Sequence, residues 1–513
     1  MAGWIADDKK RNVIPRWRDF TQTLKLGELS PIHTLGSKHS DFIHSEFHKK
    51  KIIDWQTERT IKNAIELLNS SYVVDDLEQS HEAALYLNNQ KKITSPSVGI
   101  LAERILEPYI VENSLSQPSN FKDLDSVLRP LVKDLRISIN NNLNNSISWV
   151  ELARLYLILG KERAAERCIL VATQLSPDNR YISRIASRFF THTGDYKKAK
   201  QILKSNIAFN VDPWLLGADI GISSLQRKSS FHIKKARELI LSKNYSPFEL
   251  NELLSALATV ELNAGSIKNS RKLFNQSLVT PNDNSVAQAV WAMNHINNLN
   301  FSNSALDEIP NIYEAKAYHY FNAKQWESTM SNTLQWFVDQ PFSRDPAGFG
   351  SFIASSILEK YDDAVKLCTY GLKATPNDFT LLNNLAFSLL KMNNVKDAGT
   401  VIHKIHIGTL DEKQKAVYLA TKGLFMYKNG FSDQGANLYK ESSGLAGKIK
   451  NKKLQLLSDF HHLSIQLEID GFPDDKVAKV DQLAKQLATL DEIYLVDLVN
   501  NLKRRIEDYR TKL

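Results

Sequence analysis

Apolar and small residues recur at a spacing of 34 residues in part of this chain, most clearly between positions 146 and 210. Tyr156 and Phe190 are 34 residues apart, and so are Ala165 and Ala199. Within one period the apolar positions lie three and four apart over two stretches, which is the spacing of two amphipathic helices. The pattern therefore predicts an all-α chain built from consecutive antiparallel helix pairs.

The repeated positions are those at which one helix is expected to pack closely on the next. Small residues are favoured at such crossings, because a larger side chain would overpack the contact. The residues assigned to this packing are Trp149, Leu152, Ala153, Tyr156, Gly160, Ala165, Ala172, Pro177, Gly194, Ala199, Ala364 and Ala398.

This signature resembles that of the tetratricopeptide-repeat (TPR) family, in which each unit is a helix, a turn and a second helix. The resemblance implies a right-handed α-solenoid, a superhelix of TPR-like helix pairs with helical N- and C-terminal caps. Two stretches, IPRWRDF and PDNRYISRIASRFF, are also similar to sequences in bacterial TPR proteins of unassigned biochemistry.

Four regions are expected along the chain. Residues 1–54 show no clear periodicity and predict an irregular N-terminal arm or small subdomain. Residues 55–145 predict a helical cap or divergent repeats, and residues 146–446 predict the TPR-like array, which Pro213 is expected to interrupt. Residues 447–513 predict capping helices that cover the exposed face of the last repeat, as the ends of a solenoid require.

The composition agrees with an elongated array, since 513 residues exceed the usual size of a single hydrophobic core. There is no run of about 18 apolar residues and no apolar core near the start, so neither a transmembrane helix nor a signal peptide is predicted. Cys168 and Cys368 are expected on second helices far apart in the array, as packing residues in a reducing compartment. These features predict a cytoplasmic protein.

No motif in the sequence assembles catalytic chemistry: there is no phosphate-binding loop, no nucleophile elbow and no C-x-x-C pair. His44 and His48 have a spacing that can hold zinc, with His39 and Glu46 nearby. Ser45, however, stands where a zinc protease needs glutamate, and three lysines follow. A solvated polar face is therefore favoured over zinc. We expect no catalytic residue, no cofactor and no metal, and we predict that the protein is not an enzyme.

The TPR resemblance implies a binding groove lined by the first helix of each repeat. In the best-aligned repeats the groove includes Arg154, Arg184, Arg188 and His192. Converging guanidinium groups suit a carboxylate or a phosphate, since each can form paired hydrogen bonds. The alternative is that these arginines pair with acids on adjacent helices, such as Glu151 or Asp178.

Later repeats would add aromatic and amide side chains to the groove, for contact with apolar groups and with the backbone of an extended peptide. These residues are Tyr318, Phe321, Asn383 and Asn384. For the two aromatic residues, packing within the repeat is the favoured alternative. The basic clusters at 197–200 and 234–237 permit nucleic-acid binding, but they follow the pattern of a solvated helix face. The formal charge of +8 permits an acidic partner without requiring nucleic acid.

The leading hypothesis is a non-catalytic TPR scaffold or adaptor that binds a protein partner through its concave groove within a multi-protein complex. One alternative is a regulatory or sensor subunit of a bacterial anti-phage defence system that controls a partner effector. The other is a nucleic-acid-binding solenoid.

Overall fold

The computed structural model describes residues 11–19, 40–74, 78–90, 98–99, 102, 105–106, 124–296, 299, 306, 309–490 and 492–511. Where it is described, the chain is helical apart from turns, short irregular connections and the extended stretch 11–19. It divides into two compact units. The N-terminal unit spans Lys10–Ile312, and the C-terminal unit holds Tyr313–Leu513.

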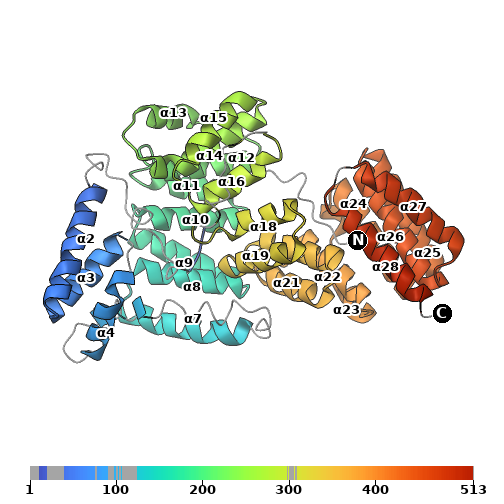
Figure 1. Cartoon of the computed structure of the whole chain (residues 1–513), viewed down its shortest axis with the longest axis horizontal. Coiled ribbons are helices and arrows are strands. Elements are labelled where there is room, and N and C mark those ends of the chain that lie inside the picture. Colours follow the sequence, from blue (N-terminus) through green and yellow to red (C-terminus); the bar gives the residue numbers. More distant parts are fainter. Residues whose placement is uncertain are drawn as a thin grey trace. The chain divides into compact units, whose positions relative to one another are not determined.

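The N-terminal unit is a succession of helix pairs (Figure 1). Its helices are α2 (Ser40–Thr57), α3 (Ile61–Val74), α4 (His81–Asn89), α7 (Leu124–Asn141), α8 (Ser146–Ile158), α9 (Glu162–Leu175), α10 (Arg180–His192), α11 (Tyr196–Ser205), α12 (Pro213–Leu225), α13 (Ile233–Leu241), α14 (Pro247–Asn263), α15 (Ile267–Ser277) and α16 (Asp283–Met293). Helix α8 packs on α9, α10 on α11, and α14 on α15. We call α8, α10, α12, α14 and α16 the first helices of this unit.

The C-terminal unit continues in the same way, with α18 packed on α19, α22 on α23 and α24 on α25. Its helices are α18 (Tyr313–Asn322), α19 (Trp326–Asp339), α20 (Arg344–Phe352), the π-helical turn η5 (Ile353–Ile357), α21 (Tyr361–Ala374), α22 (Phe379–Lys391), α23 (Val395–His403), the 3₁₀ turn η6 (Ile407–Thr409), α24 (Glu412–Lys428), α25 (Ser432–Lys448), α26 (Lys452–Asp470), α27 (Asp474–Ala488) and α28 (Leu495–Arg510). The predicted all-helical fold of consecutive helix pairs is therefore confirmed. The handedness of a superhelix stays a prediction.

Many of these helices begin where a side chain accepts hydrogen bonds from otherwise unsatisfied backbone N–H groups. Asn145, Asn179 and Asp378 cap α8, α10 and α22 in this way. Asp212 caps α12, and Pro213 is the first residue of that helix. Our expectation that Pro213 interrupts the repeat was wrong, because proline lacks only an N–H that the first helical turn leaves unpaired.

The turn between the two helices of a pair has the same backbone conformation in repeat after repeat. One residue in it has a positive φ, between 55° and 84°. These residues are Gly160, Gly194, Gly265, Lys324, Glu359, Asn393 and Gly430. Glycine adopts this conformation without steric cost, whereas the other residue types at this position adopt it at some cost.

Five residues after each of these turns lies a buried small residue of the second helix, at the point where it crosses the first. These residues are Ala165, Ala199, Ser270, Thr329, Ala364, Ala398 and Gly435. The crossing at Gly435 is tight, since an added Cβ would lie 2.6 Å from Cδ2 of Tyr427 and 3.0 Å from the carbonyl oxygen of Gly423. A larger residue at this position would force the two helices apart.

One part of the chain differs from the sequence-based expectation. We predicted an irregular region over residues 1–54, but Ser40–Thr57 forms helix α2. The apolar residues of this stretch do not recur at a helical spacing in the sequence, so periodicity gave no signal. The parts of the expected arm at 1–10 and 20–39 lie outside the described residues.

The C-terminal helices pack in sequence, α26 on α27 and α27 on α28, and α28 also reaches back to a much earlier part of its unit. Asn501 Nδ2 donates a hydrogen bond to the carbonyl oxygen of Ile357 in η5 (2.8 Å), and the rings of Tyr494 and Phe352 meet edge to face. Arg505 binds Glu468, and Lys503 binds Asp481. The basic residues of α28 therefore form ion pairs within the unit.

Both cysteines are buried on second helices, as predicted. Burial raises the pKa of the Cys168 thiol to about 11 and that of Cys368 to about 12, so both are poor nucleophiles near neutral pH. Within the described part of the chain, none of the helices combines the length and apolarity needed to cross a lipid bilayer.

Adding a single methyl group at the tight crossing tests the packing rule. We expect Gly435→Ala to lower the melting temperature of the protein by several degrees, because the new Cβ meets an aromatic ring and a backbone oxygen. Gly444 lies on the same helix with nothing within 4 Å of an added Cβ. Gly444→Ala should leave the melting temperature unchanged or raise it, since alanine favours helix by about 1 kcal/mol. Equal melting temperatures for the two variants in circular dichroism would contradict this account.

Candidate functional site

The first helices of the N-terminal unit are buried on nearly all sides, whereas the second helices bury only a stripe. Every residue from Arg180 to Thr191 of α10 is buried, while α11 buries only Ala199 and Leu203. Many of the buried side chains on the first helices are polar or charged. Polar side chains normally stay at the surface unless they have hydrogen-bond or ion-pair partners. This face must therefore be covered by groups that supply such partners.

The cover is supplied by residues 11–19, which we call the N-terminal segment. It forms no helix or strand, and from Val13 to Arg18 its residues alternate between buried and half-buried, as expected for an extended chain that lies with one side against the protein. Val13, Pro15 and Trp17 are buried, and the residue after each of them (Ile14, Arg16 and Arg18) is half-buried. No regular secondary structure holds this segment, so side chains of the first helices must recognise it.

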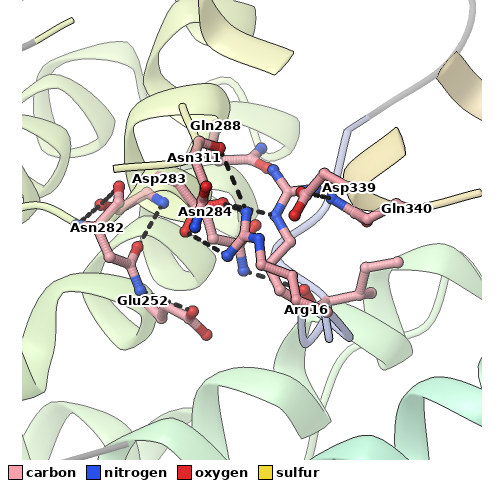
Figure 2. Close-up of polar contacts among 12 residues, drawn as sticks. Arg16, Glu252, Asn282, Asp283, Asn284, Gln288, Asn311, Asp339 and Gln340 are labelled. Carbon is pink, nitrogen blue, oxygen red and sulfur yellow. Dashed lines mark hydrogen bonds and ion pairs between the residues drawn. The ribbon is translucent and has the colours of Figure 1, made fainter. Parts of the chain in front are cut away.

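One side of the N-terminal segment lies against α16, where amide side chains bind its backbone. Asn284 Nδ2 donates to the carbonyl oxygen of Ile14 (3.0 Å), and Gln288 Nε2 donates to that of Arg11 (2.8 Å). The oxygens of the same two amides accept hydrogen bonds from the Arg11 guanidinium, at 2.9 and 2.7 Å. Asn284 and Gln288 can act together because residues four apart lie on one face of a helix (Figure 2).

The first residue of α16, Asp283, binds two arginines of the N-terminal segment. Its carboxylate receives two hydrogen bonds from Arg18, at 2.5 and 3.3 Å, and one from Arg16 Nε at 3.1 Å (Figure 2). Burial alone would raise the pKa of Asp283, but the guanidinium groups of Arg18 and Arg16 outweigh it and lower the pKa. An acid at the start of a helix also interacts favourably with the helix dipole. Asp283 is thus a charged anchor for an arginine pair.

The other side of the N-terminal segment lies against α12 and α10. A Cβ added to Gly221 of α12 would lie 2.0 Å from the carbonyl oxygen of Val13, so only glycine allows the backbone this close. Trp17 is fully buried, and its ring meets Phe189 of α10 edge to face at 6.4 Å. This side therefore selects for shape and apolar bulk.

At the end of the N-terminal segment, Arg154 of α8 binds Asp19 at 2.5 Å and also binds Glu151 at 3.1 Å. The sequence offered two readings of Arg154, as a ligand for a carboxylate or as the partner of an acid such as Glu151. Both contacts are present, and both carboxylates come from this chain.

The other predicted groove residues of this unit have different surroundings. Arg184 is buried, and it binds Glu252 of α14 at 2.8 Å and the carbonyl oxygen of Trp214 at 3.3 Å. Its guanidinium also lies over the Trp214 ring, 4.6 Å from the centroid. Arg188 is buried on the same helix, and His192 is half-buried at the end of that helix. A direct role of these residues in partner binding stays a prediction.

The groove residues predicted for later repeats all lie in the C-terminal unit. Tyr318 packs against Trp336 and Phe349, and Phe321 also contacts Phe349. Both asparagines, Asn383 and Asn384, are buried in α22. Asn384 Nδ2 donates to Ser351 Oγ at 3.0 Å. These contacts join helices of the C-terminal unit to one another, and a binding role for the four residues also stays a prediction.

The basic clusters are partly neutralised by acidic residues of the same helix or of neighbouring helices. Lys198 binds Glu166 at 2.8 Å, Lys235 lies 3.6 Å from Glu238, and Arg237 binds Glu261 at 2.5 Å. As for the zinc hypothesis, His48 is buried with Nδ1 2.9 Å from Ser70 Oγ, while the side chains of the other candidate ligands fall outside the described residues. No group of three or more potential metal ligands is found among the described side chains.

Sequence reasoning missed the residues that hold the N-terminal segment: Asp283, Asn284, Gln288 and Gly221. The two helices that carry these residues, α12 and α16, were not aligned as first helices of repeats. The places of these residues on the binding face were therefore not assigned. One signal was available in the N-terminal segment itself, where apolar residues at 13, 15 and 17 alternate with Arg16 and Arg18.

Comparisons with known proteins find solved structures that are similar to the chain at low sequence identity. No family model matches the chain, and none of the curated proteins matches it. Among solved structures it is similar to yeast Tom70, with 13% identity and a TM-score of 0.31 over 88% of this chain and 96% of that chain. It is also similar to a structure of the APC/C hetero-tetramer Cut9–Hcn1, with 12% identity and a TM-score of 0.32 over 91% and 95% of the two chains.

A third similar structure is that of Naa15/Naa10 bound to HypK-THB, with 12% identity and a TM-score of 0.23 over 93% of this chain and 82% of that chain. These matches are to TPR-containing proteins. Because the identities and TM-scores are low, the assignment of a TPR-like fold rests on the helix pairs and turns described above.

Removing the charge of Asp283 should loosen the N-terminal segment. We expect Asp283→Asn to increase the rate at which trypsin cleaves after Arg16 by about tenfold, which corresponds to the loss of about 1.4 kcal/mol from the bound state. The rate is measured by mass spectrometry of the Arg16–Trp17 cleavage. Glu166→Gln is the matched control, since it removes one carboxylate of the same unit that binds Lys198 instead of the segment. Equal cleavage rates in the two variants would show that the ion pairs to Asp283 do not hold the segment.

Proposed function

We propose that this protein is a non-catalytic, TPR-like scaffold that holds an extended segment of a protein partner on the first helices of its N-terminal unit, within a multi-protein complex. The observation that carries the proposal is the bound N-terminal segment, a nine-residue extended chain (residues 11–19) in contact with α8, α10, α12 and α16.

The contacts on this face are those of a peptide-binding site. Asn284 and Gln288 bind main-chain carbonyl oxygens, which every peptide has, and such contacts supply affinity. Asp283 and the space around Trp17 contact side chains, which supplies specificity. In addition, Arg154 binds a carboxylate at one end of the segment, which supports its predicted use toward an acidic group of a partner.

The protein-partner hypothesis is favoured over nucleic acid by the charge of this face. Asp283, Glu252 and Glu151 lie among its arginines, so the face carries both signs. A phosphate backbone is bound by arginine and lysine without such acids, because its charge is uniformly negative.

A comparison of partner capture tests the proposal. Tagged wild-type protein, purified under mild conditions from the cells that express it naturally, should carry a protein in a fixed ratio that survives nuclease treatment. Gly221→Ala should lose that protein, because its Cβ occupies the position of the bound backbone. Gly444→Ala, whose Cβ meets nothing within 4 Å, should retain it.

The possible contrary results point to different errors. A partner that Gly221→Ala retains would bind elsewhere on the molecule, and the first-helix proposal would be wrong. Recovery of RNA or DNA instead of a protein, with a steep dependence on salt, would favour the nucleic-acid alternative. Circular dichroism of both variants controls for loss of the fold.

A further inference from the structure

We propose that the N-terminal segment is a built-in occupant of the peptide site, and that the partner's segment has the same chemistry. That chemistry is an extended stretch in which a large aromatic residue has one arginine on each side. Small apolar residues precede it at alternate positions. This inference rests on the function proposed above, and it adds the class of ligand and a competition that controls access to the site.

The requirement for two arginines follows from the side of the segment that meets α16. Residues two apart in an extended chain point the same way, so Arg16 and Arg18 both reach Asp283. The side chain of Asp283 is 11% exposed, and a buried carboxylate needs cationic partners to offset its desolvation. A segment with neutral or acidic residues at these two positions would leave this charge buried and unmatched.

The apolar requirement follows from the opposite side. Trp17 is fully buried and Val13 is 1% exposed, so both positions must be filled by apolar groups. Pro15 between them is buried as well, and proline suits this place because its fixed φ is compatible with an extended chain and it brings no N–H that would need a partner. Gly221 requires that the backbone, rather than a side chain, passes over α12.

The backbone contacts make exchange of one chain for another possible. The amides of Asn284 and Gln288 bind carbonyl oxygens at two places, and they would bind those of another chain equally well. The segment has no helix or strand of its own, so it can leave without unfolding any element. Because it is tethered, its effective concentration at the site is of millimolar order, and a free competitor must overcome that advantage.

Fluorescence anisotropy with a labelled peptide of residues 10–20 tests the competition in the full-length protein. The double variant Trp17→Ala/Arg18→Ala weakens the tethered segment and leaves the first helices unaltered. We expect this variant to bind the peptide at least tenfold more tightly than the wild type does. Adding Gly221→Ala to the double variant should abolish binding, because the Cβ blocks the peptide as it blocks the segment.

A second peptide tests the ligand class. With glutamate in place of Arg16 and Arg18, the peptide should bind the double variant at least tenfold more weakly than the parent peptide. Equal binding of both peptides would overturn the assigned chemistry. Equal binding of the parent peptide by the wild type and the double variant would overturn the competition.

If the double variant does not fold, amide hydrogen exchange of the wild type tests whether the N-terminal segment leaves its site. The amides of the N-terminal segment should exchange faster than those of α12 and α16, since the segment leaves without unfolding them. Exchange only at the rate of these helices would make the segment a fixed part of the core and overturn the proposal. Partner capture that depends on Gly221, together with no peptide binding, would leave the proposed function intact and refute only this ligand class.

Discussion

The fold depends on a close crossing of two helices that recurs in each pair. A residue with positive φ turns the chain back, and five residues later a small buried residue lets the second helix lie against the first. Interiors are close-packed, so the space at this point admits a side chain the size of alanine, serine or threonine, and only glycine where Tyr427 crowds it. Each pair then offers its first helix to the next pair, which produces the continuous face that binds the N-terminal segment.

That face is polar, and its polar groups are matched across repeats. Arg180 binds Asp212 at 2.5 Å, and Glu252 accepts hydrogen bonds from both Arg184 and Asn282. Buried charges are tolerated only with such partners. At Asp283 the partners come instead from the N-terminal segment, and Arg154 binds Asp19 of the segment in addition to Glu151 of its own helix. Asp283 and Arg154 therefore each have a charge that an occupant of the face binds, whereas the two ion pairs named first are made among the helices of the unit.

The sequence was sufficient for the helix pairs, because Gly160, Gly194, Ala165 and Ala199 repeat in place. It was weaker where the same geometry is built from other residues: Glu359 and Asn393 form the turn without glycine, and Ser270 and Thr329 replace alanine at the crossing. Most residues of the site could not be predicted from the sequence. Arg16 and Asp283 are 267 residues apart, and spacing along the chain does not reveal which distant helices a solenoid's curvature brings to one segment.

The two terminal elements differ in a way that bears on function. Helix α28 packs on its own unit through Leu495, Leu498, Leu502 and Ile506, which are all buried, and burial of each such side chain contributes about 1.5–3 kcal/mol. Removing it would expose a continuous apolar stripe, so α28 is a permanent part of its unit. The N-terminal segment instead alternates buried and half-buried side chains, and it buries apolar groups only at alternate positions. It is also bound through ion pairs and main-chain hydrogen bonds, and another extended chain of the same chemistry can reproduce all of these contacts. A binding site needs an occupant of this second kind, and for that reason we assign partner recognition to the first helices of the N-terminal unit.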